Sequence, residues 1–328
     1  MPLIEYTSNG LYCKQADVFI DPVRAVDKAL ITHAHADHAR WGSKYYLANE
    51  ISEHVMRLRL GKDINLESIS YNKTININGV KISFHPAGHI PGSSQIRLEY
   101  KDEIWVITGD YKTEDDGLST PFEPVKCTHI VTESTFGLPI YNWKSQKEIF
   151  EEINQWWNKN AMENKCSVLV GYSLGKAQRL LNGLDQSIGK VLVHPTIYET
   201  NEALQKSGVQ LSNYHKIDKS LQAEDTKGAM IICTPNAMND NTLNKFEPYE
   251  IAYCSGWMAL RGAKNRMPID RGFVISDHAD WKGLNFAIKE SQAENVYVTH
   301  GYNAVFARWL REQGINGMEL NTLFDRIE

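Results

Sequence analysis

Short runs in which apolar and polar residues alternate dominate the first part of the chain. Alternation with period two predicts half-buried strands, and clusters such as Ser8-Asn9-Gly10 mark the turns between them. By this pattern we expect short strands at residues 3–6, 11–13, 18–20, 29–32 and 45–48. Residues 51–60 have helical spacing and end at Gly61, so one helix interrupts the strands.

Two hairpins follow. Asn78-Gly79 joins the alternating runs 74–77 and 80–84, and this dipeptide is a strong signal for a two-residue β-turn. Lys101-Asp102 joins the runs 95–100 and 104–108 in the same way. The second hairpin ends in Thr108-Gly109-Asp110, and residues 128–132 form one more predicted strand.

The pattern changes near residue 140. Ser145 and Glu148 are spaced as a capping box at the start of a helix over 145–160. Strands and helices then alternate, which is the rhythm of a parallel α/β sheet. We predict strands at 167–171, 190–193, 230–233 and 251–253, and helices at 174–184 and 197–206. Short strands return at 273–275 and 296–299, before a helix at 303–313.

Length and composition predict a soluble protein with either one large domain that carries an insertion or two domains. A chain of 328 residues exceeds the size at which a single core stops growing, and 42% of its residues are hydrophobic. No apolar run reaches the roughly 18 residues of a membrane span, and the N-terminus has no signal-peptide pattern. We therefore expect a cytoplasmic protein without a membrane partner.

Cysteine usage and charge restrict the picture further. The cysteines are scattered, odd in number and without Cys-x-x-Cys spacing, which favours core thiols over disulfides or a cysteine zinc site, at positions Cys13, Cys127, Cys166, Cys233 and Cys254. The formal net charge is −5, so a nucleic-acid partner would have to bind a local basic surface.

The densest chemistry lies in Thr-His-Ala-His-Ala-Asp-His at 32–38, which we call the histidine loop. It places His33, His35, Asp37 and His38 within six residues. Imidazole nitrogen and carboxylate oxygen together suit a cation such as Zn²⁺. The first pair of histidines and the following Asp-His pair point in different directions, so the loop is typical of a site for two ions.

Further ligand or proton-transfer groups follow other predicted strands. They are His89, Asp110, Glu133, His278 and His300. Strand ends at one edge of a sheet can converge on one cleft although they are far apart in sequence.

With these motifs the sequence resembles the metallo-β-lactamase fold in its nucleic-acid-processing branch, the β-CASP nucleases. The resemblance extends from residue 33 to residue 300 and includes Gly-His-Ile-Pro-Gly-Ser, Thr-Gly-Asp, Glu-Ser-Thr-Phe-Gly, Ser-Asp-His-Ala-Asp and Thr-His-Gly. The bacterial ligase-associated DNA exonucleases are the most similar subgroup. The implied fold is α/β, an αββα sandwich of residues 1–137 and 271–328 with a β-CASP-like cap inserted at 138–270.

The resemblance also implies roles for individual residues. One divalent ion would be held by His33, His35 and His89, and the other by Asp37, His38 and His300, with Asp110 bridging. The ions, Zn²⁺ or Mn²⁺ or both, would activate a hydroxide for phosphodiester hydrolysis, and Asp37 counts among the catalytic groups. His278 would be the general acid with Glu133 orienting its ring, whereas a purely structural role for His278 is the alternative.

A groove beside the cap should bind the substrate. Ser173, Lys176 and Arg179 belong to a cap segment that is similar to a phosphate-facing helix start, and a basic run precedes the His278 motif, at Arg261, Lys264, Arg266 and Arg271. A solvated basic face is the alternative for that run. Trp41 could stack on a base, but the sequence favours a packed core position.

The resulting prediction is a single-strand DNA exonuclease in DNA repair, with 5′ to 3′ polarity, that works together with DNA ligase and helicase. An RNA-processing nuclease of the same fold is the alternative, because His300 is typical of RNA 3′-end-processing relatives. A catalytically inactive scaffold or a small-molecule hydrolase such as a lactonase fits less well, since no expected ligand is missing and the cap and the Glu133–His278 pair are present.

Overall fold

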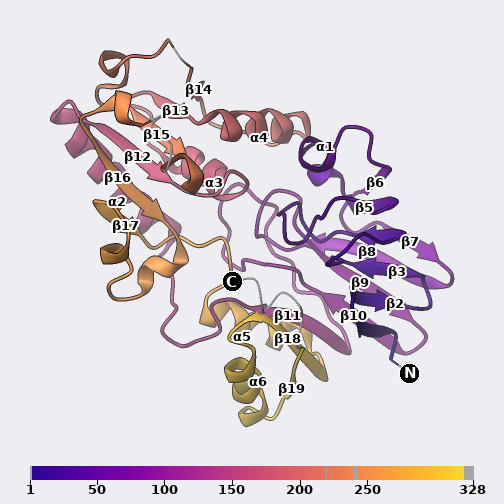
Figure 1. Cartoon of the computed structure of the whole chain (residues 1–328). Helices are drawn as coiled ribbons and strands as arrows, with labels where there is room; N and C mark the ends of the chain where they lie inside the picture. Colours follow the sequence, from indigo (N-terminus) through magenta and orange to yellow (C-terminus); the bar gives the residue numbers. More distant parts are fainter. Residues whose placement is uncertain (1, 219, 239–242, 321–328) are drawn as a thin grey trace. The chain divides into compact units, whose positions relative to one another are not determined.

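A computed structural model describes residues 2–218, 220–238 and 243–320 (Figure 1). The chain forms two compact units. Unit 1 comprises residues 1–142 and 278–328, and unit 2 comprises residues 143–277. The sequence places these changes near 138 and 270. None of the described helices combines the length and the apolar character that a membrane crossing requires.

The first sheet of unit 1 has six strands in the order of the sequence. β1 to β3 are antiparallel and β3 to β6 are parallel. The strands are β1 (Ile4–Thr7), β2 (Gly10–Cys13), β3 (Val18–Ile20), β4 (Lys28–Leu30), β5 (Tyr45–Asn49) and β6 (Leu66–Ile69). The 3₁₀ turn η1 (Glu50–Ser52) and helix α1 (Glu53–Leu60) lie between β5 and β6, and Arg57 of α1 donates to the carbonyl of Leu66 at 3.2 Å.

The second sheet has seven strands in the order β19-β18-β11-β10-β9-β8-β7. Their bounds are β7 (Thr74–Ile77), β8 (Val80–Pro86), β9 (Ser94–Tyr100), β10 (Glu103–Ile107), β11 (His129–Ser134), β18 (Asn295–Gly301) and β19 (Asn316–Glu319). β10, β11, β18 and β19 are parallel, whereas β9 is antiparallel to both β8 and β10. β8, β10, β11 and β18 therefore end at the same edge, where the site residues lie.

The two sheets pack face to face over one apolar core. Leu30 and Leu47 of the first sheet join Phe84, Leu98 and Val131 of the second in this core. The opposite face of the second sheet is covered by α5 (Trp281–Ser291) and α6 (Asn303–Glu312), which contribute buried side chains such as Leu284, Ile288, Phe306 and Leu310 (Figure 1). This packing fixes the returning C-terminal part of unit 1 on the same sheet that carries β8 and β10.

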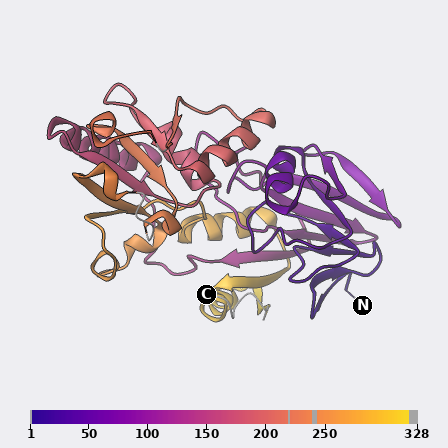
Figure 2. The same ribbon diagram turned by 45° about the horizontal axis from the view of Figure 1, so that its top comes forward.

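Unit 2 is built on one parallel six-stranded sheet, as the alternating pattern predicts, and runs from magenta to orange in Figure 2. The strands lie in the order β14 (His215–Lys216), β13 (Val191–Val193), β15 (Met230–Cys233), β12 (Cys166–Val170), β16 (Tyr249–Cys254) and β17 (Arg271–Phe273). Helices α2 (Gln146–Met162), α3 (Lys176–Gly183) and the start of α4 (Pro195–Lys206) pack on one face. Short 3₁₀ turns supply Ala237 and Phe246 to the other face, from η3 (Pro235–Met238) and η4 (Asn244–Phe246).

Most predicted elements are confirmed. Asn78 and Gly79 have φ angles of 53° and 86°, as the predicted two-residue turn requires, and β7 and β8 pair antiparallel. The predicted capping box of α2 is present between Ser145 and Glu148. All five cysteines are buried and free, which confirms their interpretation as core thiols.

The sequence pattern did not predict strands β6 and β19 or helix α5. Residues 273–275 were predicted as a strand, but β17 ends at Phe273 because the chain pairs with β16 earlier, from Arg271.

Candidate metal centre

The histidine loop follows β4 and is held in place at its first residue, Thr32. The backbone N–H of Ser94 donates to the carbonyl of Thr32 at 2.8 Å, which ties the loop to the start of β9 in the other sheet. Asp21 accepts from the Thr32 backbone N–H at 2.8 Å and from its hydroxyl at 2.5 Å. The first histidine of the loop therefore projects from a fixed backbone.

Hydrogen bonds to Asp21 and Thr32 also orient two rings of the loop. The Thr32 hydroxyl donates to Asp21, so it accepts from Nδ1–H of His33, whose Nδ1 lies 3.1 Å away. A neutral His33 then carries its lone pair on Nε2. Asp21 Oδ2 lies 2.7 Å from Nδ1 of His38 and turns Nε2 of that ring toward Asp37 and Asp110. Such carboxylate–histidine contacts are typical of metal ligands.

His89 and Asp110 reach the same point from the second sheet. The loop after β8 is closed by Ser93, whose hydroxyl accepts from the backbone N–H of His89 at 3.0 Å. Asp110 follows Gly109, which has a φ of 56°. A Cβ at Gly109 would lie 2.6 Å from the Thr32 hydroxyl, so only glycine lets β10 end this close to the histidine loop.

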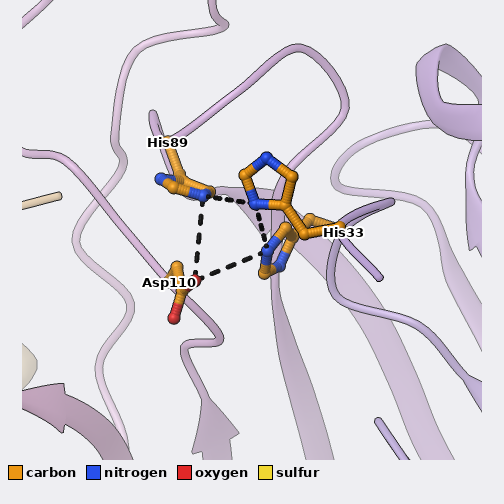
Figure 3. Close-up of side chains that lie close together, drawn as sticks. His33, His89 and Asp110 are labelled. Atoms are coloured by element: carbon orange, nitrogen blue, oxygen red, sulfur yellow. Dashed lines mark hydrogen bonds and ion pairs between the residues drawn. The ribbon is translucent and has the colours of Figure 1, made fainter. Parts of the chain in front are cut away.

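Three histidines and one carboxylate present their donor atoms to one another. Nδ1 of His35 lies 3.1 Å from Nε2 of His33 and 3.1 Å from Nε2 of His89. Oδ2 of Asp110 lies 3.5 Å from Nε2 of His33 and 3.8 Å from Nε2 of His89. Figure 3 shows His33, His89 and Asp110 pointing toward one another.

The distances between these donor atoms fit a cation with tetrahedral coordination. Ligand atoms at ~2.1 Å from a metal ion in tetrahedral geometry are about 3.4 Å apart, and the four measured distances run from 3.1 to 3.8 Å. All four donor atoms lie within 4.8 Å of one another. Nε2 of His33 and Nε2 of His89 both face Nδ1 of His35, whose single proton or lone pair can satisfy only one of them. One cation satisfies all three nitrogens.

The second predicted set is only partly assembled. Nε2 of His38 lies 3.6 Å from Asp37 Oδ2 and 3.6 Å from Asp110 Oδ2, so Asp110 faces both sets. The His300 ring stacks on the His38 ring at 5.5 Å between centroids. Within the described residues, the donors of Asp37, His38 and His300 do not form a group within 4.8 Å of one another. The geometry therefore supports the first set more strongly than the second.

Burial and neighbouring charges set the ionisation of these groups. Burial lowers the pKa of His33 well below its usual value, and the His38 charge adds to this effect. Burial alone would lower the pKa of His38, but Asp110 and Asp21 raise it well above its usual value. Burial alone would raise the pKa of Asp110, but the charges of His38 and His278 hold it well below its usual value.

Glu133 and His278 form a second pair beside this cluster. Nδ1 of His278 lies 2.8 and 3.1 Å from the two carboxylate oxygens of Glu133, and the backbone N–H of Tyr111 donates to Glu133 at 2.8 Å. Asp110, Glu133 and His278 also form a group of donors within 4.8 Å, and the His278 and His89 rings lie 4.7 Å apart. The contact with Glu133 holds His278 beside the candidate metal centre, although the two residues are 145 positions apart in the chain.

The residues predicted to contact phosphate differ in burial and in ion pairing. Lys176 and Arg179 are buried within unit 2 and pair with Asp277, at 2.8 and 3.3 Å. Lys176 also donates to the carbonyl of Ile275 at 3.0 Å, and Arg179 to that of Ser276 at 2.5 Å. Both cations are directed at Asp277 and at backbone carbonyls, and their role as phosphate contacts remains a prediction.

The other predicted contacts remain predictions. Ser173 is half-buried, and its carbonyl accepts from Gln178 at 2.9 Å. Arg261 and Lys264 are exposed, whereas the Arg271 guanidinium lies over the Phe273 ring at 4.7 Å. The side chain of Arg266 lies outside what the structure describes.

Sequence reasoning missed Asp21 and misplaced Trp41. Asp21 was interpreted only as part of an Asp-Pro turn, and no local signal shows that it reaches Thr32 and His38. The Trp41 side chain was expected in the core, but the residue is 76% exposed, so that interpretation is wrong.

Comparison with known proteins adds sequence relatives. No protein-family model matches the chain. Over 317 residues, 96% of this chain, the sequence is 28% identical to a protein of Opitutus terrae named probable DNA ligase, and the match covers 31% of that protein. It is 30% identical over 127 residues to cleavage and polyadenylation specificity factor subunit 3 of Dictyostelium discoideum, and 28% identical over 123 residues to endoribonuclease YSH1 of Saccharomyces cerevisiae. These two matches each cover 37% of this chain and 16% of the relative.

A solved structure shares the fold. The crystal structure of a protein of unknown function from Enterococcus faecalis V583 aligns with a TM-score of 0.60 and 12% sequence identity, over 90% of this chain and 79% of that one. The chain spans less than a third of the length of the sequence relatives named above.

Proposed function

We propose that the chain is a divalent-metal-dependent phosphodiesterase that acts on nucleic acid. The observation that carries the proposal is the convergence of His33, His35, His89 and Asp110 beside the Glu133–His278 pair. A cation site next to a carboxylate-bound histidine provides both charge stabilisation and a proton donor for an ester. The similarity to proteins named endoribonuclease supports a nuclease over other hydrolases.

The fold supports the same assignment. We infer that unit 1 has the metallo-β-lactamase fold, because two sheets pack face to face and helices cover the outer face of the second. Unit 2, with its parallel sheet inserted between two parts of unit 1, would be the β-CASP-like cap.

We infer the first ligand set from the geometry of its donor atoms and the second from the family pattern. His33, His35, His89 and Asp110 would hold one ion, and Asp37, His38 and His300 would hold a second with Asp110 shared. Nitrogen and oxygen donors of this kind suit Zn²⁺ or Mn²⁺. When bound, the ions would polarise the phosphate and lower the pKa of the attacking water.

The chain's own groups have separable tasks. Glu133 accepts from Nδ1–H of His278 and so fixes the ring, leaving Nε2 as the atom that can hold a proton for the departing oxygen. Asp21 and Thr32 hold the His33 and His38 rings in the orientation that ligands need.

As substrate we propose single-stranded DNA, cleaved from an end with 5′ to 3′ polarity in DNA repair. The support is that nearly the whole chain is similar to part of a protein named probable DNA ligase. A protein in which such a unit is joined to a ligase would need the two activities on the same molecule of DNA. Functional association with DNA ligase and helicase belongs to this proposal.

RNA processing is the second candidate. It is favoured by the similarity to endoribonuclease YSH1 and by His300, which stacks on His38 within the candidate metal centre. An endonuclease acting on RNA would use the same residues in the same roles.

The test compares labelled single-stranded DNA, duplex DNA and RNA of matching sequence, each with Mn²⁺ or Zn²⁺. Labels at the 5′ and 3′ ends report polarity and separate end-directed from internal cleavage. We expect cleavage of single-stranded DNA from its 5′ end and its loss in the His278→Ala variant. Faster cleavage of RNA would favour the second candidate. Absence of cleavage of all three substrates with both metals would refute the proposal.

A further inference from the structure

A cavity of about 450 Å³ lies in unit 1 beside the histidine loop, and none of the roles assigned above uses it. Arg24 follows β3, Arg40 and Trp41 follow the histidine loop, and Arg59 comes from α1. Ligand pockets measure ~300 to 1,000 Å³. The cavity therefore has the size of a binding site for a small group.

Trp41 has no packing role that explains its position. Its 76% exposure leaves a large apolar ring in contact with water at the mouth of a cavity. Burying an aromatic ring is favourable, so an exposed tryptophan gains from a planar partner. Every nucleobase offers such a face, and stacking on aromatic side chains is the general way in which proteins bind single strands.

The arginines supply the complementary charge. Arg40 donates to the carbonyl of Asp37 at 3.1 Å, and Arg59 donates to the carbonyl of Ala34, so both guanidinium groups are held against the histidine loop. The hydrogen bond of Arg59 uses one of its five N–H donors. The planar guanidinium is suited to bidentate contact with phosphate.

The lining is more basic than the protein as a whole. Among the described residues that line the cavity there are three arginines and no acidic residue, whereas the formal net charge of the chain is −5. A local basic surface of this kind is what a net acidic protein needs to bind a nucleic acid.

Two residues that line the cavity neighbour the predicted metal ligands in sequence. Ala36 and Ala39 line it, and they alternate along the loop with His35, Asp37 and His38. An occupant that contacts Ala36 and Ala39 would therefore touch residues that directly adjoin predicted metal ligands in the chain.

We propose that this cavity binds one nucleotide of a single-stranded nucleic acid that flanks the scissile phosphate. Its base stacks on Trp41, and its phosphate contacts the guanidinium groups of Arg24, Arg40 and Arg59. The inference rests on the proposed function, since it names where the substrate of that site is held.

The experiment measures binding of a fluorescein-labelled single-stranded oligonucleotide with phosphorothioate linkages, by anisotropy in the presence of Mn²⁺. Trp41→Ala should weaken binding about 5- to 150-fold, the range expected for loss of one stacked base, and Trp41→Phe should restore most of it. Phe286→Ala is the matched control, because Phe286 is an exposed aromatic residue of unit 1 outside the cavity.

The charge contribution is measured from the salt dependence of the same binding. Arg24→Ala should reduce the slope of log Kd against log salt by about 0.7, the value for one phosphate contact on a single strand. Arg308→Ala is its control, since Arg308 is exposed on α6 and pairs with Glu312. Both test positions are exposed, so the melting temperatures should stay within those of the controls.

A scan with one abasic nucleotide locates the stacked base. The native protein should lose affinity when the abasic site occupies one particular position, and Trp41→Ala should be insensitive at that position. If the native protein cleaves nucleic acid but Trp41→Ala and Arg24→Ala bind like their controls, the cavity proposal is overturned and the proposed function stands. If the native protein neither binds nor cleaves nucleic acid, both fail.

Discussion

Asp110 is the residue that the two predicted ligand sets have in common. Its Oδ2 atom faces nitrogens of His33, His38 and His89 at 3.5, 3.6 and 3.8 Å. We expect Asp110→Ala to lose both metal ions, whereas Asp37→Ala should lose only the second, because Asp37 lies outside the first donor group. Elemental analysis after dialysis gives the ratio of metal to protein, and nuclease assays should show no cleavage by either variant.

Asp17→Ala is the control for this pair, since Asp17 forms an exposed ion pair with Lys28. Unchanged metal content in Asp110→Ala would contradict the shared ligand. A fully active Asp37→Ala would contradict the second ion.

Asp21 should act through the residues that it holds. It accepts from Thr32, whose hydroxyl contacts His33, and it lies 2.7 Å from His38. Asp21 therefore fixes the His33 and His38 rings, although it does not belong to the first donor group. Loss of such a contact typically costs about 10- to 100-fold in metal affinity. We expect Asp21→Asn to show a drop of this size in competition with a chelator, and an unchanged affinity would mean that the two rings need no such support.

Sequence motifs predict the ligands but not this support. His33, His89 and Asp110 stand in short motifs at strand ends, and a motif can be recognised without knowing the fold. Asp21 contacts Thr32 and His38 because β3 and β4 are neighbours in one sheet, and such a pairing leaves no mark on the residues around Asp21.

Among the elements, predictability followed the strength of the local signal. Asn78-Gly79 dictates its turn, and the capping box at Ser145 starts α2. Helix α5 was missed although a signal existed: Asp280 accepts from the Gly283 N–H, and Leu284, Ala287 and Ile288 share the buried face.

The link between α3 and the segment before His278 gives a prediction about stability. Lys176 and Arg179 are buried and both pair with Asp277. Removing one partner of a buried ion pair leaves uncompensated charge and costs about 3–5 kcal/mol. Asp277→Asn should lower the free energy of unfolding of unit 2 by about this amount, measured by urea denaturation with hydrogen exchange to locate the change.

Glu151→Gln provides the contrast. Glu151 pairs with Lys147 at 4.0 Å on the exposed side of α2, and exposed pairs contribute about 0–1 kcal/mol. If the two variants unfold alike, the buried network does not stabilise unit 2. The phosphate role first predicted for Lys176 and Arg179 would then merit testing again.

For the whole chain, the family resemblance implied an inserted cap at 138–270, and the change from alternating strands to an α/β rhythm near residue 140 agreed with it. The structure divides the chain at 142 and 277. The pattern could not show which basic residues face solvent. Lys176 is buried and pairs with Asp277, which is 101 positions away in the chain. Arg24 and Trp41 are exposed beside a cavity that forms only when the histidine loop has folded.

Buried thiols in both units give the chain a predictable response to alkaline pH. Burial raises the pKa of Cys127, Cys166 and Cys254 from 9.0 to about 12. Between pH 9 and 12 these thiols ionise in the unfolded chain but stay protonated in the folded one. Stability that is fully present below pH 9 is therefore lost as pH rises, by about 1.4 kcal/mol per pH unit for each thiol.

Two measurements check this response. Urea denaturation at pH 8 and pH 10 should show lower stability at the higher pH, and the slope should be smaller in Cys127→Ala and Cys166→Ala because each removes one ionising thiol from the unfolded state. A thiol reagent at pH 8 should modify the native protein far more slowly than the unfolded protein, since the thiolate is the reactive form. Rapid modification of the native protein would contradict the burial of these thiols, and with it the cores of both units as described.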